Sequence, residues 1–438
     1  MADTEKLHCS FCGVEKSPQV PLISGSEGRI CEACVKLAFQ VVGSWGQRRR
    51  NQTRAPELRT PAAIKQHLDE YVIGQDTAKE TLAVAVFNHY LRLMNQGQQP
   101  FCQQQGSVEL EKSNVLLAGP SGTGKTLLVR SLARVLGVPF AAADATTLTQ
   151  AGYVGDDVDS IIARLLEAAG GDVEQTQWGI VYIDEVDKLA KRGGGATAVR
   201  DISGEGVQQA LLKIVEGTEL KLPKSGRRRD GGEELTVDTG NILFIVGGAF
   251  PGLEDVVRDR IRPRQSSIGF LNSPTDEAPP VNELLSALQP DDLQKFGLIP
   301  EFIGRFPVIT FLQELDVDTL IRILTEPRNA LVKQYRQLFA YQGVTLDITD
   351  EAIRFVAEQA VERHTGARGL RAVLEAALRS TMFSMPSTSG LRRCVLQLRY
   401  EAGYEGSKAE LEVVTVTSEV AETMPLSPAV PESLSLEM

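Results

Sequence analysis

The octapeptide Gly119-Pro120-Ser121-Gly122-Thr123-Gly124-Lys125-Thr126 fits the pattern G-x-x-x-x-G-K-[ST] at every position. It follows a short apolar run and precedes a helical stretch, Leu127 to Leu136. Glycines in such a loop allow backbone N–H groups to surround phosphate oxygens, and the N-terminus of the following helix adds partial positive charge. The stretch therefore predicts an ATP site formed by residues 119–127, in which Lys125 contacts the β- and γ-phosphates and Thr126 binds Mg²⁺.

An acidic pair follows 58 residues after Thr126, where the apolar run Ile180-Val-Tyr-Ile183 ends in Asp184 and Glu185. A carboxylate at the end of a strand beside a phosphate loop holds Mg²⁺ through water, which we expect of Asp184. The next carboxylate is placed to orient and deprotonate an attacking water, which we expect of Glu185. The pair favours ATP hydrolysis over ATP binding alone.

The apolar runs on either side of these motifs indicate the fold. Residues 115–118, 180–183 and 242–246 are short, rich in β-formers and apolar throughout, as strands buried on both faces must be. They alternate with helical patterns, which predicts an α/β domain with a parallel sheet over residues 62–311.

Helical patterns dominate the chain beyond residue 312. Apolar residues recur with helical spacing from Ile353 to Val361, after Thr349 or Asp350 as the N-cap, and again from Leu370 to Leu378. Two β-like stretches, 394–398 and 411–416, are expected to pair. We predict a smaller, mainly helical domain over 312–416 and a disordered tail over 417–438, which is rich in proline and lacks basic residues.

The N-terminal segment carries two C-x-x-C pairs, Cys9 with Cys12 and Cys31 with Cys34, separated by 18 residues. Two such turns offer the four soft ligands of a closed, structural zinc site. Four unrelated thiols or a redox pair are the alternatives. We predict a zinc-binding domain over residues 1–50, which would fold with its metal because so short a segment buries little apolar surface. A basic, flexible linker is expected over 51–61.

Composition excludes several classes of protein. The 438 residues are 42% hydrophobic and 24% charged, typical of a globular chain long enough for about three domains. A net charge of −11 argues against a surface that grips nucleic acid throughout. Six cysteines are too few for a disulfide-stapled secreted fold, and no run of about 18 apolar residues or signal peptide is present. We expect a cytoplasmic protein with no membrane contact.

Further motifs accompany the ATP-binding pattern. They are Ala151-Gly-Tyr-Val-Gly155, Ile268-Gly-Phe270, Gly304-Arg305 and Gly366-Ala-Arg368. Together with the cysteines and the Asp184-Glu185 pair, they make the chain resemble the ClpX family of AAA+ ATPases over about residues 5–412. The resemblance implies a homohexamer that unfolds tagged proteins, recognised directly or through adaptor proteins, and delivers them to the ClpP peptidase.

The resemblance also implies roles for individual residues. Arg305 matches the arginine finger that reaches the nucleotide of a neighbouring subunit, and Arg368 matches the sensor-2 arginine. Val72 and Ile73 match the apolar wall of the adenine pocket. Four residues match substrate-contacting loops of the pore, and three match the loop that docks on ClpP; they are Tyr153, Val154, Arg200 and Arg228 in the pore and Ile268, Gly269 and Phe270 in the docking loop. Arg227-Arg228-Arg229 stands where the family commonly has Arg-Lys-His, which leaves the preferred tags open.

Three rival interpretations remain. A helicase or clamp-loader-like ATPase would use nucleic acid as its partner, but the segment 152–155 carries none of the basic residues that a DNA-translocating loop needs. HslU, a similar protease partner, would lack the cysteines and carry a long insert before the acidic pair. A zinc adaptor with a degenerate ATPase core would not need Lys125, Asp184 and Glu185 intact.

Overall fold

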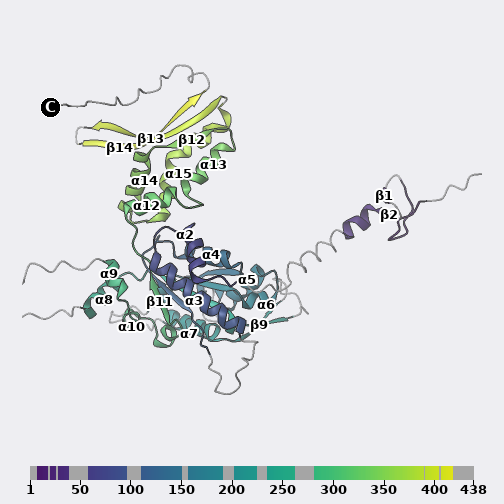
Figure 1. The fold of residues 1–438 in the computed structure, drawn as a ribbon, viewed down its shortest axis with the longest axis horizontal. Coiled ribbons are helices and arrows are strands. Elements are labelled where there is room, and N and C mark those ends of the chain that lie inside the picture. The colour runs from purple at the N-terminus through teal and green to yellow at the C-terminus, as the bar shows by residue number, and fades with distance from the viewer. Residues whose placement is uncertain are drawn as a thin grey trace, which may run out of the picture. The chain divides into compact units, whose positions relative to one another are not determined.

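The computed structural model describes residues 7–17, 20–25, 28–38, 58–95, 110–149, 156–190, 202–223, 234–261, 281–388, 390–403 and 406–417. The chain divides into two compact units, Met1–Ala55 and Pro56–Met438. Each unit is described by itself (Figure 1).

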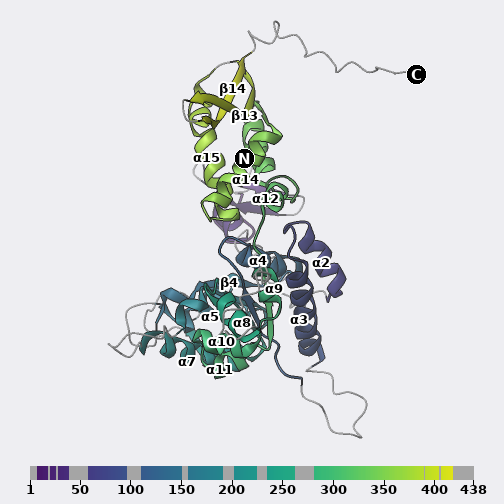
Figure 2. The ribbon, with the colours of Figure 1, turned by 90° about the vertical axis from the view of Figure 1, so that its left-hand side faces the viewer.

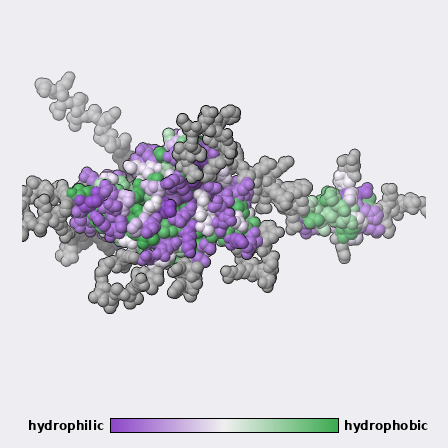
Figure 3. Space-filling model, turned by 90° about the horizontal axis from the view of Figure 1, so that it is seen from below, coloured by the Kyte–Doolittle hydropathy of each residue, from purple (hydrophilic) through white to green (hydrophobic). Residues whose placement is uncertain are grey.

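The N-terminal unit is built around a short antiparallel pair of strands. β1 (Leu22–Ser24) pairs with β2 (Arg29–Cys31), and residues 32–38 continue from β2 as a helix. Among the described residues of this unit, Cys9 and Cys31 are the buried apolar ones, whereas Phe11, Ile23 and Leu37 are exposed. The smaller coloured body in Figure 3 is accordingly green over much of its visible face. So small a core requires a further source of stability, such as a metal.

The second unit contains a five-stranded parallel sheet with the strand order β11-β3-β10-β7-β4. These strands are β3 (Val115–Ala118), β4 (Phe140–Asp144), β7 (Ile180–Asp184), β10 (Leu243–Gly248) and β11 (Val308–Phe311). The three strands predicted from sequence therefore form its centre. The α/β class with a parallel sheet is confirmed.

Alternate residues of the central strands point to two separate cores. Val115, Leu117 and Tyr182 pack on one face, which is covered by α2 (Pro61–Asp69), α3 (Asp76–Asn95) and α4 (Lys125–Leu136). Leu116 and Phe244 pack on the other face. The helices there are α5 (Asp159–Ala168), α7 (Ile202–Glu216) and, after β10, α8 (Leu253–Ile261), α9 (Val281–Ser286), α10 (Pro290–Phe296) and α11 (Pro300–Gly304). Figure 2 shows α2 and α3 on one side of the sheet and α5, α7, α8, α10 and α11 on the other. Burial on both faces explains why these strands are apolar throughout.

The remaining elements of this region connect or flank the sheet. The helices are α2 (Pro61–Asp69), α3 (Asp76–Asn95), α4 (Lys125–Leu136), α5 (Asp159–Ala168), α6 (Val173–Gln177), α7 (Ile202–Glu216), α8 (Leu253–Ile261), α9 (Val281–Ser286), α10 (Pro290–Phe296) and α11 (Pro300–Gly304), with 3-10 turns η1 (Ala145–Thr147), η2 (Val186–Leu189) and η3 (Thr239–Asn241). The short strands are β5 (Leu148–Thr149), β6 (Asp156–Asp157), β8 (Glu219–Pro223) and β9 (Glu234–Asp238). The antiparallel pair β8–β9 was not predicted from sequence.

The C-terminal part of this unit has its own core. Its elements are α12 (Val317–Thr325), α13 (Leu331–Ala340), β12 (Thr345–Ile348), α14 (Asp350–Glu362), α15 (Ala367–Ser384), η4 (Met385–Ser387), β13 (Leu391–Gly403) and β14 (Gly406–Thr417). Thr349 is the N-cap of α14 and accepts a hydrogen bond from the Ala352 N–H. The predicted pairing is confirmed, since Cys394 lies opposite Thr415 and Leu398 opposite Leu411. β12 adds to β13 in parallel, so the sheet is larger than the sequence suggested.

Within the residues that the structure describes, no helix is long and apolar enough to cross a membrane.

Candidate active site

The loop between β3 and α4 has a backbone that only glycine adopts without strain. Gly119, Gly122 and Gly124 have φ of 148°, 81° and 98°. A Cβ on Gly119 would lie 2.6 Å from the Leu312 carbonyl oxygen, so this glycine also permits close packing. α4 begins at Lys125, two residues before the predicted helical stretch, so the N-terminus of α4 points into the loop.

Lys125 lies inside this loop with only 8% of its surface exposed. Its Nζ donates to the Gly119 carbonyl at 2.6 Å and to the Pro120 carbonyl at 3.0 Å. Burial lowers the pKa of Lys125, although the nearby carboxylates of Asp184 and Asp187 favour its charged form. An ammonium with three donors, held at the start of a helix, is suited to bind phosphate oxygens.

The acidic pair lies directly across from the start of α4. Thr126 Oγ1 donates to Asp184 Oδ2 at 2.9 Å, and the other oxygen of Asp184 accepts the Glu185 N–H at 3.0 Å. Glu185 has φ of 59° and ψ of 31°, a left-handed conformation that is uncommon for a residue with a side chain. Such local strain is often found at functional positions.

These residues line one cavity of about 400 Å³ together with residues from the C-terminal part of the unit. Its lining is Ser121, Gly122, Gly124, Lys125, Thr126, Leu127, Asp184, Glu185, Asp187, Lys188, Ala249, Ala367 and Arg368. Arg368 is the second residue of α15, and the Ala367 N–H donates to the Gly122 carbonyl at 3.2 Å. The structure thus brings Arg368 to the same cavity as Lys125, Asp184 and Glu185.

Asp187 is a lining residue that the sequence analysis missed. Its side chain is 2% exposed, and its Oδ1 accepts the Ala249 N–H at 3.1 Å, which links the ends of β7 and β10. Its position two residues after the acidic pair was the available signal. No sequence motif assigns a role to a third carboxylate at this position, so the sequence alone did not indicate Asp187.

Arg305 is not among the residues that line this cavity. It follows α11 and forms an ion pair with Glu216, with Nη2 and Oε1 at 2.6 Å. Its side chain is 53% exposed. Because the Arg305 side chain is exposed on its own chain, another subunit could contact it.

Val72 and Ile73 are buried but do not line the cavity either. Val72 belongs to the core beneath α2 and α3. The turn that carries both residues is fixed by Gln75, whose amide donates to the Gln313 carbonyl at 2.9 Å and accepts the Gln313 N–H at 2.7 Å. Gln75 thereby ties the turn to the segment that leads from β11 into α12.

The predicted pore and docking residues lie outside the described residues. They are Tyr153, Val154, Arg200, Arg228, Ile268, Gly269 and Phe270.

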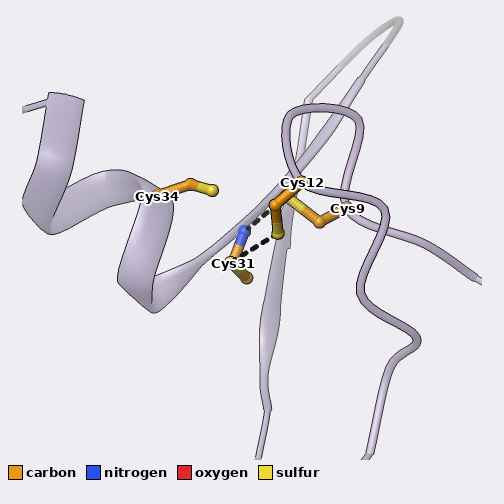
Figure 4. A group of neighbouring side chains, drawn as sticks. All are labelled: Cys9, Cys12, Cys31 and Cys34. Carbon is orange, nitrogen blue, oxygen red and sulfur yellow. Dashed lines mark hydrogen bonds between the residues drawn. The ribbon is translucent and has the colours of Figure 1, made fainter.

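The four N-terminal cysteines form one cluster (Figure 4). The sulfur atoms of Cys9, Cys12, Cys31 and Cys34 all lie within 4.8 Å of one another. Cys12 Sγ and Cys31 Sγ are 3.6 Å apart, and the Cys31 N–H donates to Cys9 Sγ at 3.3 Å. Backbone N–H donation, first from Cys12, lowers the pKa of Cys9 to about 6, so its thiolate is favoured near neutral pH.

The cluster fits a tetrahedral zinc ion. Zn–S bonds of about 2.3 Å at tetrahedral angles place sulfur atoms about 3.8 Å apart. The Cys12–Cys31 sulfur separation of 3.6 Å is close to that value, and the other sulfur pairs lie within 4.8 Å. A loop supplies Cys9 and Cys12, while the end of β2 and the following helix supply Cys31 and Cys34, so all four coordination positions are filled by protein.

Comparison with known proteins agrees with both sites. Family profiles match as "AAA domain (Cdc48 subfamily)" over residues 110–309, as "C-terminal, D2-small domain, of ClpB protein" over 315–394, and as "ClpX C4-type zinc finger" over 7–43. The chain is 71% identical to the ATP-dependent Clp protease ATP-binding subunit ClpX of Azotobacter vinelandii, over 96% of this chain and 94% of that protein. It is 58% identical to ClpX 3 of Methylococcus capsulatus (strain Bath), over 89% and 91%.

The phosphate loop with its acidic pair, the four-cysteine cluster and the extent of this similarity lead to one conclusion. The chain belongs to the ClpX family of AAA+ ATPases, and it is an ATP-hydrolysing enzyme that uses Mg²⁺ and carries Zn²⁺ on its four N-terminal cysteines.

Proposed function

We propose that this ATPase is a cytoplasmic, hexameric protein unfoldase that draws tagged polypeptides through its pore and passes them to the ClpP peptidase. The zinc domain, 1–50, would recognise substrates and adaptor proteins. The large and small AAA+ domains, 62–311 and 312–416, would bind ATP between them. The observation that carries this proposal is the cavity in which Arg368 of the C-terminal part meets Lys125 and Glu185.

Within that cavity each side chain has a distinct task. Lys125 and the N–H groups of the loop bind the phosphates, and Thr126 and Asp184 hold Mg²⁺, which neutralises charge on the phosphates when bound. Glu185 orients the attacking water and accepts its proton. Its backbone N–H is held by Asp184 at 3.0 Å, so the carboxylate of Glu185 extends from a fixed position.

Two arginines complete the site from other directions. Arg368 would contact the phosphates from α15 and report whether they are present; the Ala367–Gly122 hydrogen bond, which ties this helix to the phosphate loop, supports that role. Arg305 reaches the nucleotide of the neighbouring subunit and stabilises the charge that develops in the transition state. Its exposure on its own chain supports this role.

The mechanical and partner roles rest on the family. Tyr153 and Val154 would grip the polypeptide, Arg200 and Arg228 would attract it electrostatically, and Ile268-Gly269-Phe270 would dock on ClpP. The similarity to the Azotobacter vinelandii protein, whose name includes the Clp protease, supports this assignment.

Degradation assays test the partner proposal. The chain is mixed with ClpP, ATP and a tagged, folded substrate, and the substrate is followed by gel electrophoresis. Deleting Ile268-Gly269-Phe270 should abolish degradation and leave ATP hydrolysis unchanged. Degradation at the wild-type rate by this variant would show that the docking role is wrong.

A further inference from the structure

Arg305 is held on its own chain by contacts that the proposed mechanism does not use. Its Nε donates to Glu216 Oε1 at 2.9 Å, and its Nη2 lies 2.6 Å from the same oxygen. One carboxylate oxygen therefore engages one edge of the guanidinium. Nη1 has no hydrogen-bond partner among the residues that the structure describes, so the opposite edge, with its N–H donors, is left for another acceptor.

The backbone beneath Arg305 is fixed by a buried side chain. Asn114 is 2% exposed, and its Nδ2 donates to the Arg305 carbonyl at 3.0 Å. Its Oδ1 accepts the Phe244 N–H at 3.2 Å, which anchors the same amide to β10. Both ends of the Asn114 side chain are thus engaged, and the end of α11 is attached to the central sheet.

The backbone beneath Glu216 is fixed by a neighbouring residue of the same short segment. Lys112 Nζ donates to the carbonyl of Val215, the residue before Glu216, at 3.2 Å and to the Thr239 carbonyl at 3.1 Å. It also lies 4.6 Å from the centre of the Phe244 ring. The end of α7 is therefore held by residue 112 and the end of α11 by residue 114, immediately before β3.

We propose that Glu216 is a positioning residue for Arg305, and that Lys112 and Asn114 hold the two helix ends so that the guanidinium presents its free edge to the nucleotide of a neighbouring subunit. The inference rests on the proposed role of Arg305. Both side chains of the pair are about half exposed, 53% and 45%, so the ion pair contributes little to stability. Its value lies in orienting a group whose effect on the transition state depends on placement.

The test compares ATP hydrolysis by the full-length chain and by Glu216→Gln. We expect kcat to fall by about tenfold, with KM for ATP unchanged, because a misplaced group loses transition-state stabilisation and not ground-state binding. Glu216→Asp should restore part of the loss. The matched control is Asp347→Asn, which removes an ion pair of similar geometry to Arg393 at 2.7 Å, with exposures of 39% and 59%, and should leave kcat unchanged.

A double-mutant comparison separates this inference from the proposed function. Arg305→Ala alone should abolish most hydrolysis, and adding Glu216→Gln should cause no further loss. If Arg305→Ala keeps wild-type turnover, the role of Arg305 is wrong and the inference falls with it. If Arg305→Ala is inactive and Glu216→Gln keeps wild-type turnover, or if the two losses multiply, the role of Arg305 stands and the positioning role of Glu216 is overturned.

Rings assembled from two kinds of subunit can distinguish the proposed role of Glu216 from a merely structural one, because they separate the subunit that supplies Arg305 from the subunit that hydrolyses ATP. Glu185→Gln subunits cannot hydrolyse ATP but keep a correctly held Arg305, whereas Glu216→Gln subunits keep an intact hydrolytic site. Mixing the two should raise turnover per Glu216→Gln subunit above that of the pure variant. No increase would mean that Glu216 serves the site of its own chain, contrary to the proposal.

Discussion

Thr126 and Asp184, 58 residues apart in the chain, are joined by a hydrogen bond of 2.9 Å from the Thr126 hydroxyl to Asp184 Oδ2. The bond connects the first turn of α4 to the end of β7. These are the two groups expected to hold Mg²⁺, so they are already adjacent in the folded chain. The site is therefore organised by contacts within the protein, which limits the rearrangement needed for binding.

Because Thr126 and Asp184 are hydrogen-bonded, substitutions at the two positions should not have additive effects on ATP turnover. Thr126→Ala removes a hydrogen bond to a charged group, worth about 1.5–3 kcal/mol, and should lower turnover roughly 10- to 150-fold. Thr126→Ser keeps the hydroxyl and should retain most activity. Asp184→Asn should lower turnover as well, and the double variant should be no worse than the more damaged single variant. The rate of ATP turnover is measured for each variant at several Mg²⁺ concentrations. If the loss in the double variant equals the product of the losses in the two single variants, the two groups act separately.

Glu185→Gln should separate ATP binding from hydrolysis. The amide cannot accept the proton of water, so turnover should fall by about 10² to 10⁴, while ATP affinity stays near wild type because the phosphate loop is intact. Phosphate release and equilibrium binding of labelled ATP provide the two measurements. Wild-type turnover in this variant would rule out Glu185 as the general base.

Gly366→Ala should weaken ATP binding through the contact between α15 and the phosphate loop. Gly366 has φ of 54° and ψ of −147°, and a Cβ there would lie 3.2 Å from the carbonyl oxygens of Ser121 and Gly122. The methyl group would push Arg368 away from the cavity. The unfavourable backbone conformation would add strain of about 1–3 kcal/mol. Gly343→Ala is the control, because Gly343 has φ of 74° and no atom within 4 Å of its Cβ position. Equal loss of ATP affinity in both variants would show that the close contact of Gly366 with the phosphate loop does not matter for binding.

His89 should make the stability of the unit Pro56–Met438 depend on pH. The imidazole is 1% exposed, and burial, followed by the charges of Arg92 and Lys112, lowers its pKa from 6.5 to about 3. The unfolded chain therefore binds a proton that the folded chain does not, so stability should fall as pH falls from about 6.5 towards 3. From pH 7.5 to pH 5.0 the wild-type chain should lose about 2 kcal/mol more than His89→Phe. Urea unfolding followed by Trp178 fluorescence in a Trp45→Phe background measures this, and equal losses in both chains would refute it.

Zinc removal should unfold the N-terminal unit alone. Cys12→Ser takes away one of four ligands, and a unit with so small a core depends on its metal. The bound zinc content should drop to near zero, and protease cleavage within residues 1–55 should become rapid, with basal ATP hydrolysis unchanged. Cys394→Ala, at a buried cysteine far along the chain, should keep its zinc. A Cys12→Ser chain that retains one zinc per subunit would exclude the four-cysteine site.

The parts of this protein that are predictable from sequence are those with local signatures. The phosphate loop needs glycines at fixed offsets, because the φ values of 81° and 98° at Gly122 and Gly124 would strain a residue with a side chain. The central strands need apolar residues on both faces, since each face meets a separate core. The C-x-x-C pairs are local as well, and the fold of the N-terminal unit brings the two together.

Contacts between distant residues of ordinary type could not be predicted. Gln75 forms a hydrogen bond with the backbone of residue 313, and Asn114 forms one with the backbone of residue 305. The sequence around a single glutamine or asparagine does not indicate which distant residue it will contact. Glu216 is one of several glutamates near the end of a helix, and only the packing of α7 against α11 places it beside Arg305. Val72 lies in the core beneath α2 and α3, Ile73 is buried, and neither lines the described cavity, so their place at the adenine stays a prediction from the resemblance.

ATP hydrolysis at this site should drive the unfolding of a polypeptide. To test this coupling, a stably folded fluorescent protein carrying a degradation tag is mixed with the full-length chain, and fluorescence and phosphate release are recorded together. Fluorescence should fall with ATP and stay constant with a non-hydrolysable analogue or with Glu185→Gln. Constant fluorescence despite ATP hydrolysis, with the rate stimulated by single-stranded or duplex DNA, would contradict it.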